Sequence, residues 1–316
     1  MAKRGFSRIF LPSVFASLVL FFLFAYPAGM AAAEDAALWA PLVARLAADG
    51  FDKTGMQTLF GPGGVEFDPR IMTRKVDSMV YGQFEPAPKP TARTLEKSAY
   101  RRFLTPWTLT WAARFMDENK EALETAERDY GPPREVITAI LLVETKLGSY
   151  LGERNALDVL ASMALCKDFS LIEKRLKSVK GSPERLAYAK KCASEKADWA
   201  YQELAALLRY AAFKGQDPRA LPGSIYGAIG ICQFMPTNAL KFGVDADGDG
   251  RVDLFATRDA IHSVANYLRG HGWTPGITED GKKSVIYAYN HSDLYVLAVL
   301  TVAGRLHDRR LGKKNS

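Results

Sequence analysis

The stretch REVITAILLVETKLG, residues Arg134–Gly148, determines how we interpret the rest of the chain. Two prolines precede it, and proline is favoured at the first position of a helix. Gly148 stands where a C-terminal cap is expected. Apolar residues recur at helical spacing and predict one buried face. They are Ile137, Ile140, Leu141 and Leu147. We therefore predict a buried amphipathic helix over the whole stretch.

One carboxyl group, that of Glu144, falls on the apolar face of this helix, four residues after Ile140 and seven after Ile137. Burial disfavours the charged form of a carboxyl group and therefore raises its pKa. A glutamate with a raised pKa can serve as a general acid near neutral pH. The alternatives are a glutamate paired with Arg or Lys and one that faces solvent at the edge of a cleft. The helix alone does not decide between them.

The composition is typical of a globular protein with a sizeable core. The chain has 316 residues, of which 48% are hydrophobic and 24% charged, enough for one large or two small domains. The net charge is +7, and the chain after residue 33 carries +4. This mild positive charge suits an anionic polymer or surface. No basic block interleaved with aromatic residues is present, so we predict no nucleic-acid partner.

Residues 1–33 have the pattern of a secretory signal peptide. A basic start precedes the uncharged, mostly apolar run Ile9–Tyr26, and a run of alanines ends at Ala33. We expect cleavage near Ala33 and a soluble periplasmic protein, because no cysteine near this site could carry a lipid. The alternative is an uncleaved membrane anchor, since the apolar run is almost long enough to span a bilayer. Pro12 and Pro27 weaken that alternative.

The three cysteines leave two possibilities open. Cys166 and Cys192 flank a predicted helical insertion and could form a disulfide after export. Alternatively, both of these and Cys232 could be buried thiols. Their spacing does not suit zinc.

Helical patterns dominate the chain, and period-two alternation is nearly absent. The predicted helices are Ala36–Asp49, Phe51–Leu59, Leu104–Tyr130, Ala156–Leu165, Trp199–Phe213, Pro236–Phe242, Asp259–Gly270 and Ser284–Leu306. The Lys- and Glu-rich stretch Lys167–Ser194 predicts a solvated helical excursion, and the prolines in Phe84–Thr94 predict a stiff connector. The fold class is therefore mainly α. We place a smaller N-terminal helical lobe with its connector at residues 34–97, and a helical catalytic core at residues 98–310.

The acidic loop Asp245–Asp253 is the most specific local motif. Positions 1, 3, 5 and 6 of a calcium-binding loop are occupied by Asp245, Asp247, Asp249 and Gly250. Arg251 stands at position 7, which binds the ion through its backbone carbonyl. Ala256 takes position 12, where a bidentate Glu is usual, and Asp259 is the nearest carboxylate that could complete the shell. We predict a structural Ca²⁺ ion. The alternative is an acidic turn that caps a helix.

Four motifs, in order, resemble the lytic murein transglycosylase B family. They are LLVETKLGSYLG around Glu144, SIYGAIGICQFMPTNALKFGVDADGDGRVDLF, SVANYLRGHGW and YNHSDLYVLAVL. The resemblance runs from about Tyr100 to Leu306 and implies a lysozyme-like catalytic core. It also implies that peptidoglycan glycan strands are the substrate. The bond between N-acetylmuramic acid and N-acetylglucosamine would be cleaved without water, leaving a 1,6-anhydro-muramyl end. We expect a monomer with no organic cofactor.

The chemistry requires only one carboxyl group if the substrate supplies the nucleophile. Most glycosidases use two carboxylates, but Glu153 and Asp158 lie beyond Gly148. Glu144 would protonate the departing glycosidic oxygen and then accept the proton of the muramyl C6 hydroxyl as it attacks C1. The 2-acetamido group or nearby dipoles would stabilise positive charge at C1. The alternatives are a hydrolytic muramidase and a non-catalytic peptidoglycan-binding module.

The resemblance also implies which residues contact the substrate. Ser224 and Gln233 keep the nine-residue spacing of the family and would hydrogen-bond the sugar and its acetamido group. Tyr267 would line the cleft. A turn serine and a core tyrosine are the alternatives for Ser224 and Tyr267. The remaining implied contacts are Tyr289, Asn290 and, as a weaker match, Tyr100. Asp259 matches the far calcium ligand of the family.

The chain departs from the family pattern in two places. Only sixteen residues, Thr274–Tyr289, occupy the position of a long insertion that builds a small extra lobe. Conversely, the stretch Lys167–Ala197 is longer than the family pattern predicts. Cleft depth and the preferred glycan length therefore do not follow from the resemblance.

Overall fold

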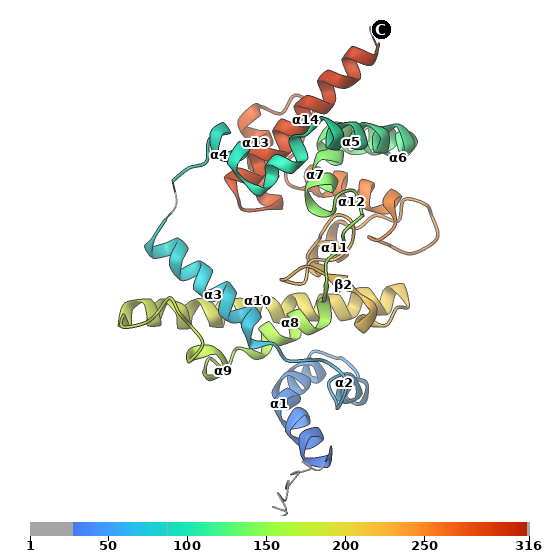
Figure 1. Cartoon of the computed structure of the whole chain (residues 1–316). Coiled ribbons are helices and arrows are strands. Elements are labelled where there is room, and N and C mark those ends of the chain that lie inside the picture. The colour runs from blue at the N-terminus through green and yellow to red at the C-terminus, as the bar shows by residue number, and fades with distance from the viewer. Residues whose placement is uncertain (1–27, 87, 315–316) are drawn as a thin grey trace, which may run out of the picture.

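The computed structural model describes residues 28–86 and 88–314 (Figure 1). Most of the predicted signal peptide, residues 1–33, lies outside this part of the chain, and residues 28–33 fall within the first helix. None of the helices that the structure describes is long and apolar enough to cross a membrane.

Helices make up most of the described chain, which confirms the predicted mainly α class. The helices are α1 (Ala28–Ala48), α2 (Lys53–Leu59), α3 (Pro69–Phe84), α4 (Ala92–Lys97), the 3-10 helix η1 (Ala99–Leu104), α5 (Pro106–Glu118), α6 (Lys120–Tyr130), α7 (Arg134–Thr145), α8 (Ala156–Leu165), α9 (Ser170–Glu173), α10 (Pro183–Lys214), the 3-10 helix η2 (Pro218–Ala220), α11 (Pro236–Phe242), α12 (Thr257–Gly270), α13 (Glu279–Tyr289) and α14 (Asp293–Lys314). Two short antiparallel strands, β1 (Arg154–Asn155) and β2 (Pro222–Gly223), pair with Arg154 opposite Gly223.

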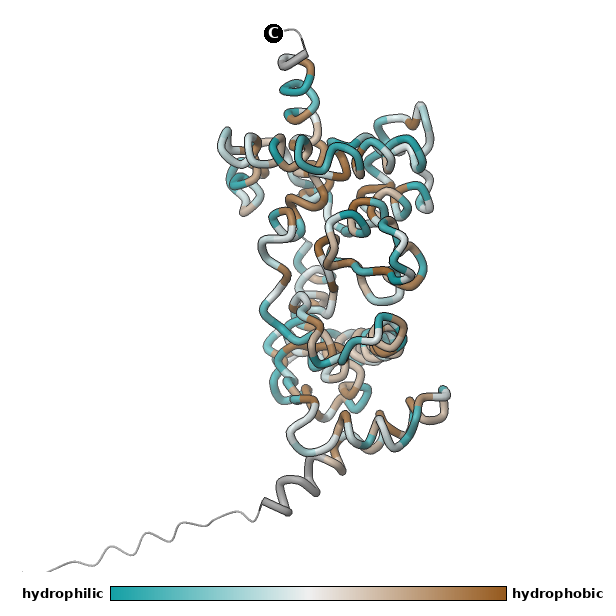
Figure 2. The backbone as a smooth tube through the Cα atoms, turned by 90° about the vertical axis from the view of Figure 1, so that its right-hand side faces the viewer, coloured by the Kyte–Doolittle hydropathy of each residue, from teal (hydrophilic) through white to brown (hydrophobic). Residues whose placement is uncertain are grey.

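The helices form two layers stacked along the long axis of the molecule (Figure 1). In one layer, α10 packs against α8 and α3, and α1 also packs against α8. In the other, α14 packs against α7 and α5, while α12 packs against α6 and α7. Helix α11 bridges them by packing on both α10 and α12. Figures 1 and 2 show an elongated molecule, with α1 at one end and the C-terminal turns of α14 at the other.

One continuous cluster of buried apolar side chains runs through both layers. Helix α1 contributes Trp39 and Leu46 to it, and α3 contributes Met72. Helix α1 packs on α8, α3 packs on α8 and α10, and α2 packs on α1, whereas α4 and η1 pack on α14. The division of the chain at residues 34–97 and 98–310 stays a prediction.

Several predicted helix boundaries were wrong for identifiable reasons. The predicted helix Leu104–Tyr130 is two helices, because the Asn119 side chain donates to the Phe115 carbonyl (2.9 Å) and ends α5. The predicted helix Ser284–Leu306 is broken at Asn290, whose backbone is extended (φ −145°). Helix α10 is continuous from Pro183 to Lys214, and so it joins the second half of the predicted excursion to the predicted helix Trp199–Phe213.

All three cysteines are buried free thiols in the structure. The possible disulfide between Cys166 and Cys192 is therefore not formed here, and the buried-thiol alternative holds. Burial raises the pKa of both Cys166 and Cys232 to about 12, so neither is a reactive thiolate near neutral pH.

Candidate active site

Helix α7 lies in the centre of its layer, between α5, α6, α12 and α14, and carries Glu144 in its last turn. The helix ends at Thr145 rather than at the predicted Gly148. Lys146 and Leu147 adopt left-handed backbone angles (φ 51° and 57°), which are uncommon for residues other than glycine. The chain turns sharply here, beginning two residues after the candidate catalytic glutamate.

The buried Thr145 holds this turn in place. Its hydroxyl donates to the Ile231 carbonyl (2.7 Å) and accepts from the Gly148 amide (3.0 Å). The first bond satisfies the Ile231 carbonyl in a neighbouring loop, and the second satisfies the Gly148 amide in the turn that follows the helix. They also join α7 to the loop that carries Gln233, so Glu144 and this loop are held in a fixed relation.

Glu144 itself is half-buried and lies among tyrosines. Burial raises its pKa from 4.5 to about 7, while the neighbouring Tyr295 hydroxyl acts in the opposite direction. The position at the negative end of α7 also disfavours the charged carboxylate. No carboxylate or cation among the described residues contributes to this pKa. Of the two alternatives to a general acid, the glutamate paired with Arg or Lys is therefore not what the described residues show.

Tyr295, on α14, was missed by the sequence analysis. Its side chain is 1% exposed, and its pKa is raised by burial and by the charge of Glu144. The hydroxyl makes no hydrogen bond of normal geometry within the described part of the chain, although it lies close enough to Glu144 to favour the carboxylate. The motif placed Tyr295 in an apolar run, where it resembles a core residue. Its hydroxyl group was the only feature that distinguished Tyr295 from the apolar residues around it.

Tyr100 and Tyr289 form an aromatic wall with Tyr295 beside Glu144, and Tyr267 packs against it. Tyr100 contacts Tyr295 edge-on, with ring centroids 6.4 Å apart, and the charge of Glu144 contributes to raising the pKa of Tyr100 after burial. The Tyr289 hydroxyl donates to the Cys232 carbonyl (2.6 Å). Tyr267 packs against Tyr289 (4.9 Å) but is 4% exposed, and its hydroxyl donates to a backbone carbonyl. The structure thus places Tyr267 as the core tyrosine behind the wall.

Ser224 and Gln233 lie at the two ends of one loop. The Ser224 hydroxyl oxygen accepts from the amides of Tyr226 (3.2 Å) and Ala228 (3.0 Å), so this residue forms a turn and keeps one O–H to donate. Gln233 has a left-handed backbone (φ 51°), and its side-chain amide donates to the Gly230 carbonyl (3.0 Å). Its side-chain oxygen accepts no hydrogen bond within the described residues.

The loop is fixed from behind by the segment that follows the acidic loop. The Ile231 amide donates to the Leu254 carbonyl (2.8 Å). Gly230 has a positive φ of 75°, and a Cβ there would lie 2.5 Å from the Leu254 side chain. Only glycine therefore allows this close approach. Asn290, at the end of α13, is exposed and has no side-chain hydrogen bond in the described structure.

The acidic loop gathers three carboxylates. Oxygen atoms of Asp245, Asp247 and Asp259 all lie within 4.8 Å of one another. Asp259 is buried and accepts from the amides of Ala246 (2.9 Å) and Asp253 (2.7 Å). Hard oxygen ligands in this arrangement fit Ca²⁺. Asp249 does not join the group; its carboxylate accepts from the Arg251 amide (2.8 Å).

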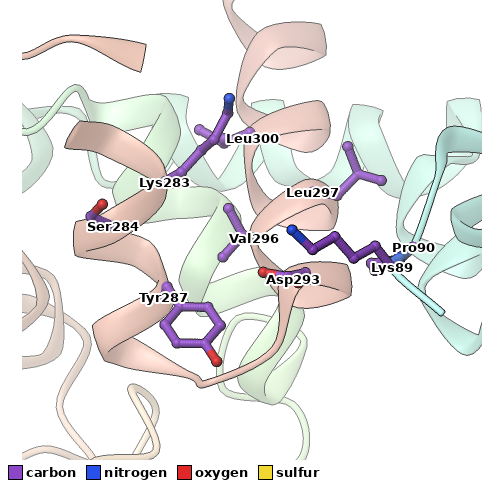
Figure 3. Close-up of a pocket in the computed structure, with 9 residues that line it drawn as sticks. All are labelled: Lys89, Pro90, Lys283, Ser284, Tyr287, Asp293, Val296, Leu297 and Leu300. Atoms are coloured by element: carbon purple, nitrogen blue, oxygen red, sulfur yellow. The ribbon is translucent and has the colours of Figure 1, made fainter. Parts of the chain in front are cut away.

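A groove of about 690 Å³ lies elsewhere, between α13, α14 and the connector at Lys89 and Pro90 (Figure 3). Its floor is formed by Val296, Leu297 and Leu300. Val296 directly follows Tyr295 on α14, so this groove and the tyrosine wall use different faces of the same helix. None of the predicted site residues lines it.

Comparison with known proteins decides the family. Residues 34–282 match the family described as the transglycosylase SLT domain. The chain belongs to this family. Over 176 residues, 56% of the chain, it is 34% identical to membrane-bound lytic murein transglycosylase B of Escherichia coli K12. The match spans 42% of that relative, which is less than half its length. The predicted resemblance is confirmed.

Solved structures show the same fold. One is the Escherichia coli lytic transglycosylase Slt35 in complex with calcium, with a TM-score of 0.64 and 23% identity over 87% of this chain and 94% of that one. Another is SltB3 of Pseudomonas aeruginosa in complex with NAG-anhNAM-pentapeptide, with a TM-score of 0.64 and 20% identity over 87% and 80%. These likenesses confirm the lysozyme-like lytic transglycosylase fold.

Proposed function

We propose that this protein is a peptidoglycan lytic transglycosylase with Glu144 as its single general acid and base. The observation that carries the proposal is the half-buried Glu144, with a pKa of about 7, among Tyr100, Tyr289 and Tyr295. A carboxyl group with this pKa is protonated often enough to donate and ionised often enough to accept at neutral pH. The family match and the named relatives support peptidoglycan as the substrate.

The reaction proceeds in two proton transfers through one carboxyl group. Glu144 donates its proton to the oxygen between muramic acid and glucosamine as the C1–O bond breaks. The resulting carboxylate accepts the proton of the muramyl C6 hydroxyl while that oxygen bonds to C1. Glu144 is thus protonated again, and the product carries a 1,6-anhydro ring. No water is consumed, which explains why a second carboxylate is unnecessary.

The neighbouring residues would position the sugar during these steps. The free O–H of Ser224 and the free side-chain oxygen of Gln233 supply one donor and one acceptor for the sugar and its acetamido group. Asn290 is exposed beside Tyr289 and could donate to the same sugar. The tyrosine wall keeps water from C1, which favours the intramolecular hydroxyl over hydrolysis. Tyr267 would act indirectly, by packing behind Tyr289.

We further propose a structural Ca²⁺ at Asp245, Asp247 and Asp259. The three converging carboxylates support it, and a structure of a relative was determined in complex with calcium. The ion would hold together a segment whose neighbour, Leu254, supports the Gln233 loop. The roles of Asp249 and of the Arg251 carbonyl stay predictions from the loop spacing.

We also propose export through residues 1–33 and a soluble periplasmic monomer after cleavage near Ala33. The basic start and apolar run of that segment support export. Recovery of the protein from the periplasmic fraction with an N-terminus near Glu34 is the expected result. Retention of Met1 in a fraction that only detergent extracts would replace it with an anchored protein.

The activity is tested by the solubilisation of purified sacculi. Wild-type protein should lower the turbidity of the suspension, and Glu144→Gln should abolish this while keeping the fold, because Gln is isosteric but cannot exchange the proton. Glu153→Gln is the matched control, since Glu153 is exposed and lies just beyond the same turn. Residual activity of Glu144→Gln above about one percent would identify another residue as the acid.

A further inference from the structure

Helix α5 lies towards the end of the molecule opposite α1 (Figure 1). It carries two neighbouring tryptophans, of which Trp107 is exposed and Trp111 is half-buried. Trp107, on the first turn of α5, is 73% exposed, and its ring centroid lies 5.8 Å from that of Trp111 one turn later. Single exposed apolar side chains are common on proteins, but a group of them at one place often marks an interaction surface. On α14, which packs against α5, Leu311 is also 44% exposed.

A cationic groove of about 530 Å³ lies beside these rings, where α4, η1, α5 and α14 meet. Lys97, Arg101 and Arg305 line it, together with one carboxylate, that of Glu96. Within the described residues, no carboxylate lies within ion-pair distance of these three cations. Pro106, the first residue of α5, also lines the groove, so the positive end of this helix dipole points the same way.

Hydrogen bonds to η1 and α5 fix the arginines of α14 at this place. Arg305 donates to the Leu104 carbonyl (2.7 Å), and Arg309 donates to the Thr110 hydroxyl (2.9 Å). The guanidinium groups therefore stand beside the turn that carries Trp107. We name this surface the α5–α14 tip; it consists of Lys97, Arg101, Trp107, Trp111, Arg305, Arg309 and Leu311. Glu96 is the one carboxylate that lines the groove, and Asp308 is an exposed carboxylate one residue before Arg309 on α14.

We propose that the α5–α14 tip docks on an anionic phospholipid membrane. The groove receives a lipid phosphate, and the indole rings lie at the level of the headgroups, where tryptophan is enriched in membrane proteins. Clustered cations next to aromatic and aliphatic side chains are the combination that binds anionic interfaces. The two rings are tilted by 36°, so they do not form one flat platform for a sugar ring.

Vesicle partitioning tests the proposal without using the enzymatic activity. The full chain is mixed with vesicles of phosphatidylglycerol and phosphatidylcholine, or with phosphatidylcholine alone, and the bound fraction is measured by sedimentation. Binding should require phosphatidylglycerol and fall as salt is added. Trp107→Ala should weaken it about tenfold, as expected for losing the burial of one large apolar side chain. Lys97→Gln with Arg101→Gln should weaken it about fivefold per charge.

Matched variants elsewhere supply the controls. Phe213→Ala removes a ring that is 62% exposed on α10, and Lys174→Gln with Arg175→Gln removes two exposed charges near α9. These variants should bind vesicles like the wild type. Circular dichroism checks that all variants are folded.

Three results would overturn the proposal. One is an equal loss of vesicle binding in the tip variants and in the control variants. Another is that the protein binds glycerol phosphate in solution through the tip but does not bind either kind of vesicle. The last is that Trp107→Ala loses binding to sacculi but binds vesicles as the wild type does. The tip would then bind glycan strands instead of a membrane.

Discussion

At the scale of single residues, the proposed activity depends on the proton of Glu144. Its carboxyl group must be protonated to assist departure of the glycosidic oxygen, so the active fraction of enzyme falls as pH rises through its pKa. Because burial raises that pKa to about 7, the loss of activity belongs near neutral pH rather than near the ordinary value for Glu. The neighbouring Tyr295 hydroxyl limits this rise in the pKa of Glu144.

We predict that kcat/KM for sacculi declines on the alkaline side with an apparent pKa of about 7. Tyr295→Phe removes the group that favours the carboxylate, so it should raise the pKa of Glu144 and move this decline to higher pH. Rates measured across the pH range for both proteins check the prediction. Tyr287→Phe, an exposed tyrosine on α13, is the control. A decline that shifts to lower pH in Tyr295→Phe would contradict the account.

Sequence patterns predicted some of these residues and not others, for physical reasons. Glu144 was found because a carboxylate on an apolar helical face is unusual. Tyr295 was missed because one hydroxyl in an apolar run does not reveal which atom it meets. The spacing of Ser224 and Gln233 was visible, but the two amides that occupy the Ser224 oxygen depend on a turn that only the folded chain shows.

At the scale of elements, the end of α7 depends on one threonine. Thr145→Val removes the bond to the Gly148 amide in the turn after Glu144 and the bond to the Ile231 carbonyl in the loop that carries Gln233. We predict a loss of about 1–3 kcal/mol in the free energy of unfolding, the usual cost of leaving buried polar groups unpaired. Activity should also fall, because Glu144 loses its fixed relation to the Gln233 loop.

The same helix supplies the control. Thr138 is also fully buried, but its hydroxyl has no hydrogen-bond partner within the described residues. Thr138→Val should therefore leave stability unchanged or increase it. Chemical denaturation of both variants measures the difference. Equal losses in the two would show that packing, not the Thr145 bonds, determines the effect.

The acidic loop gives a second prediction at this scale. Calcium at about 100 times its Kd should raise the melting temperature by about 5 °C, because an ion bound only to the folded state stabilises it. Asp247→Asn should reduce the increase, whereas the remote and exposed Asp280→Asn should not. Melting curves with excess calcium and with a chelator are compared. Coincident curves for the wild type would remove the proposed ion.

Element boundaries were harder to predict than element types. Helices α8 and α11 begin and end where the sequence pattern placed them. The end of α7 could not be predicted, because Lys146 and Leu147 adopt angles that their side chains normally avoid. Tertiary bonds from Thr145 offset that local preference. The strands β1 and β2 have two residues each, which is too short for period-two alternation to show in the sequence.

At the scale of the whole molecule, the continuous core predicts cooperative unfolding. Helices α1 and α3 pack on α8, and α3 also packs on α10, so a chain that lacks α1–α3 exposes a large apolar surface. We predict that residues 34–314 unfold in one transition, and that residues 98–310 alone do not reach a stable fold. Calorimetry and binding of a hydrophobic dye check both. An unchanged melting temperature for residues 98–310 would instead establish the predicted domain boundary.

We propose that the muramyl C6 oxygen attacks C1 while Glu144 alone moves the protons and no water is consumed, and the mass of the products tests this most directly. Sacculi are digested with the wild-type protein, and the muropeptides are analysed by mass spectrometry, with Glu144→Gln as the blank. We expect new 1,6-anhydro-muramyl ends, each of which is lighter by one water molecule than a reducing end. New reducing muramyl ends, formed only by the wild type, would show hydrolysis and contradict it.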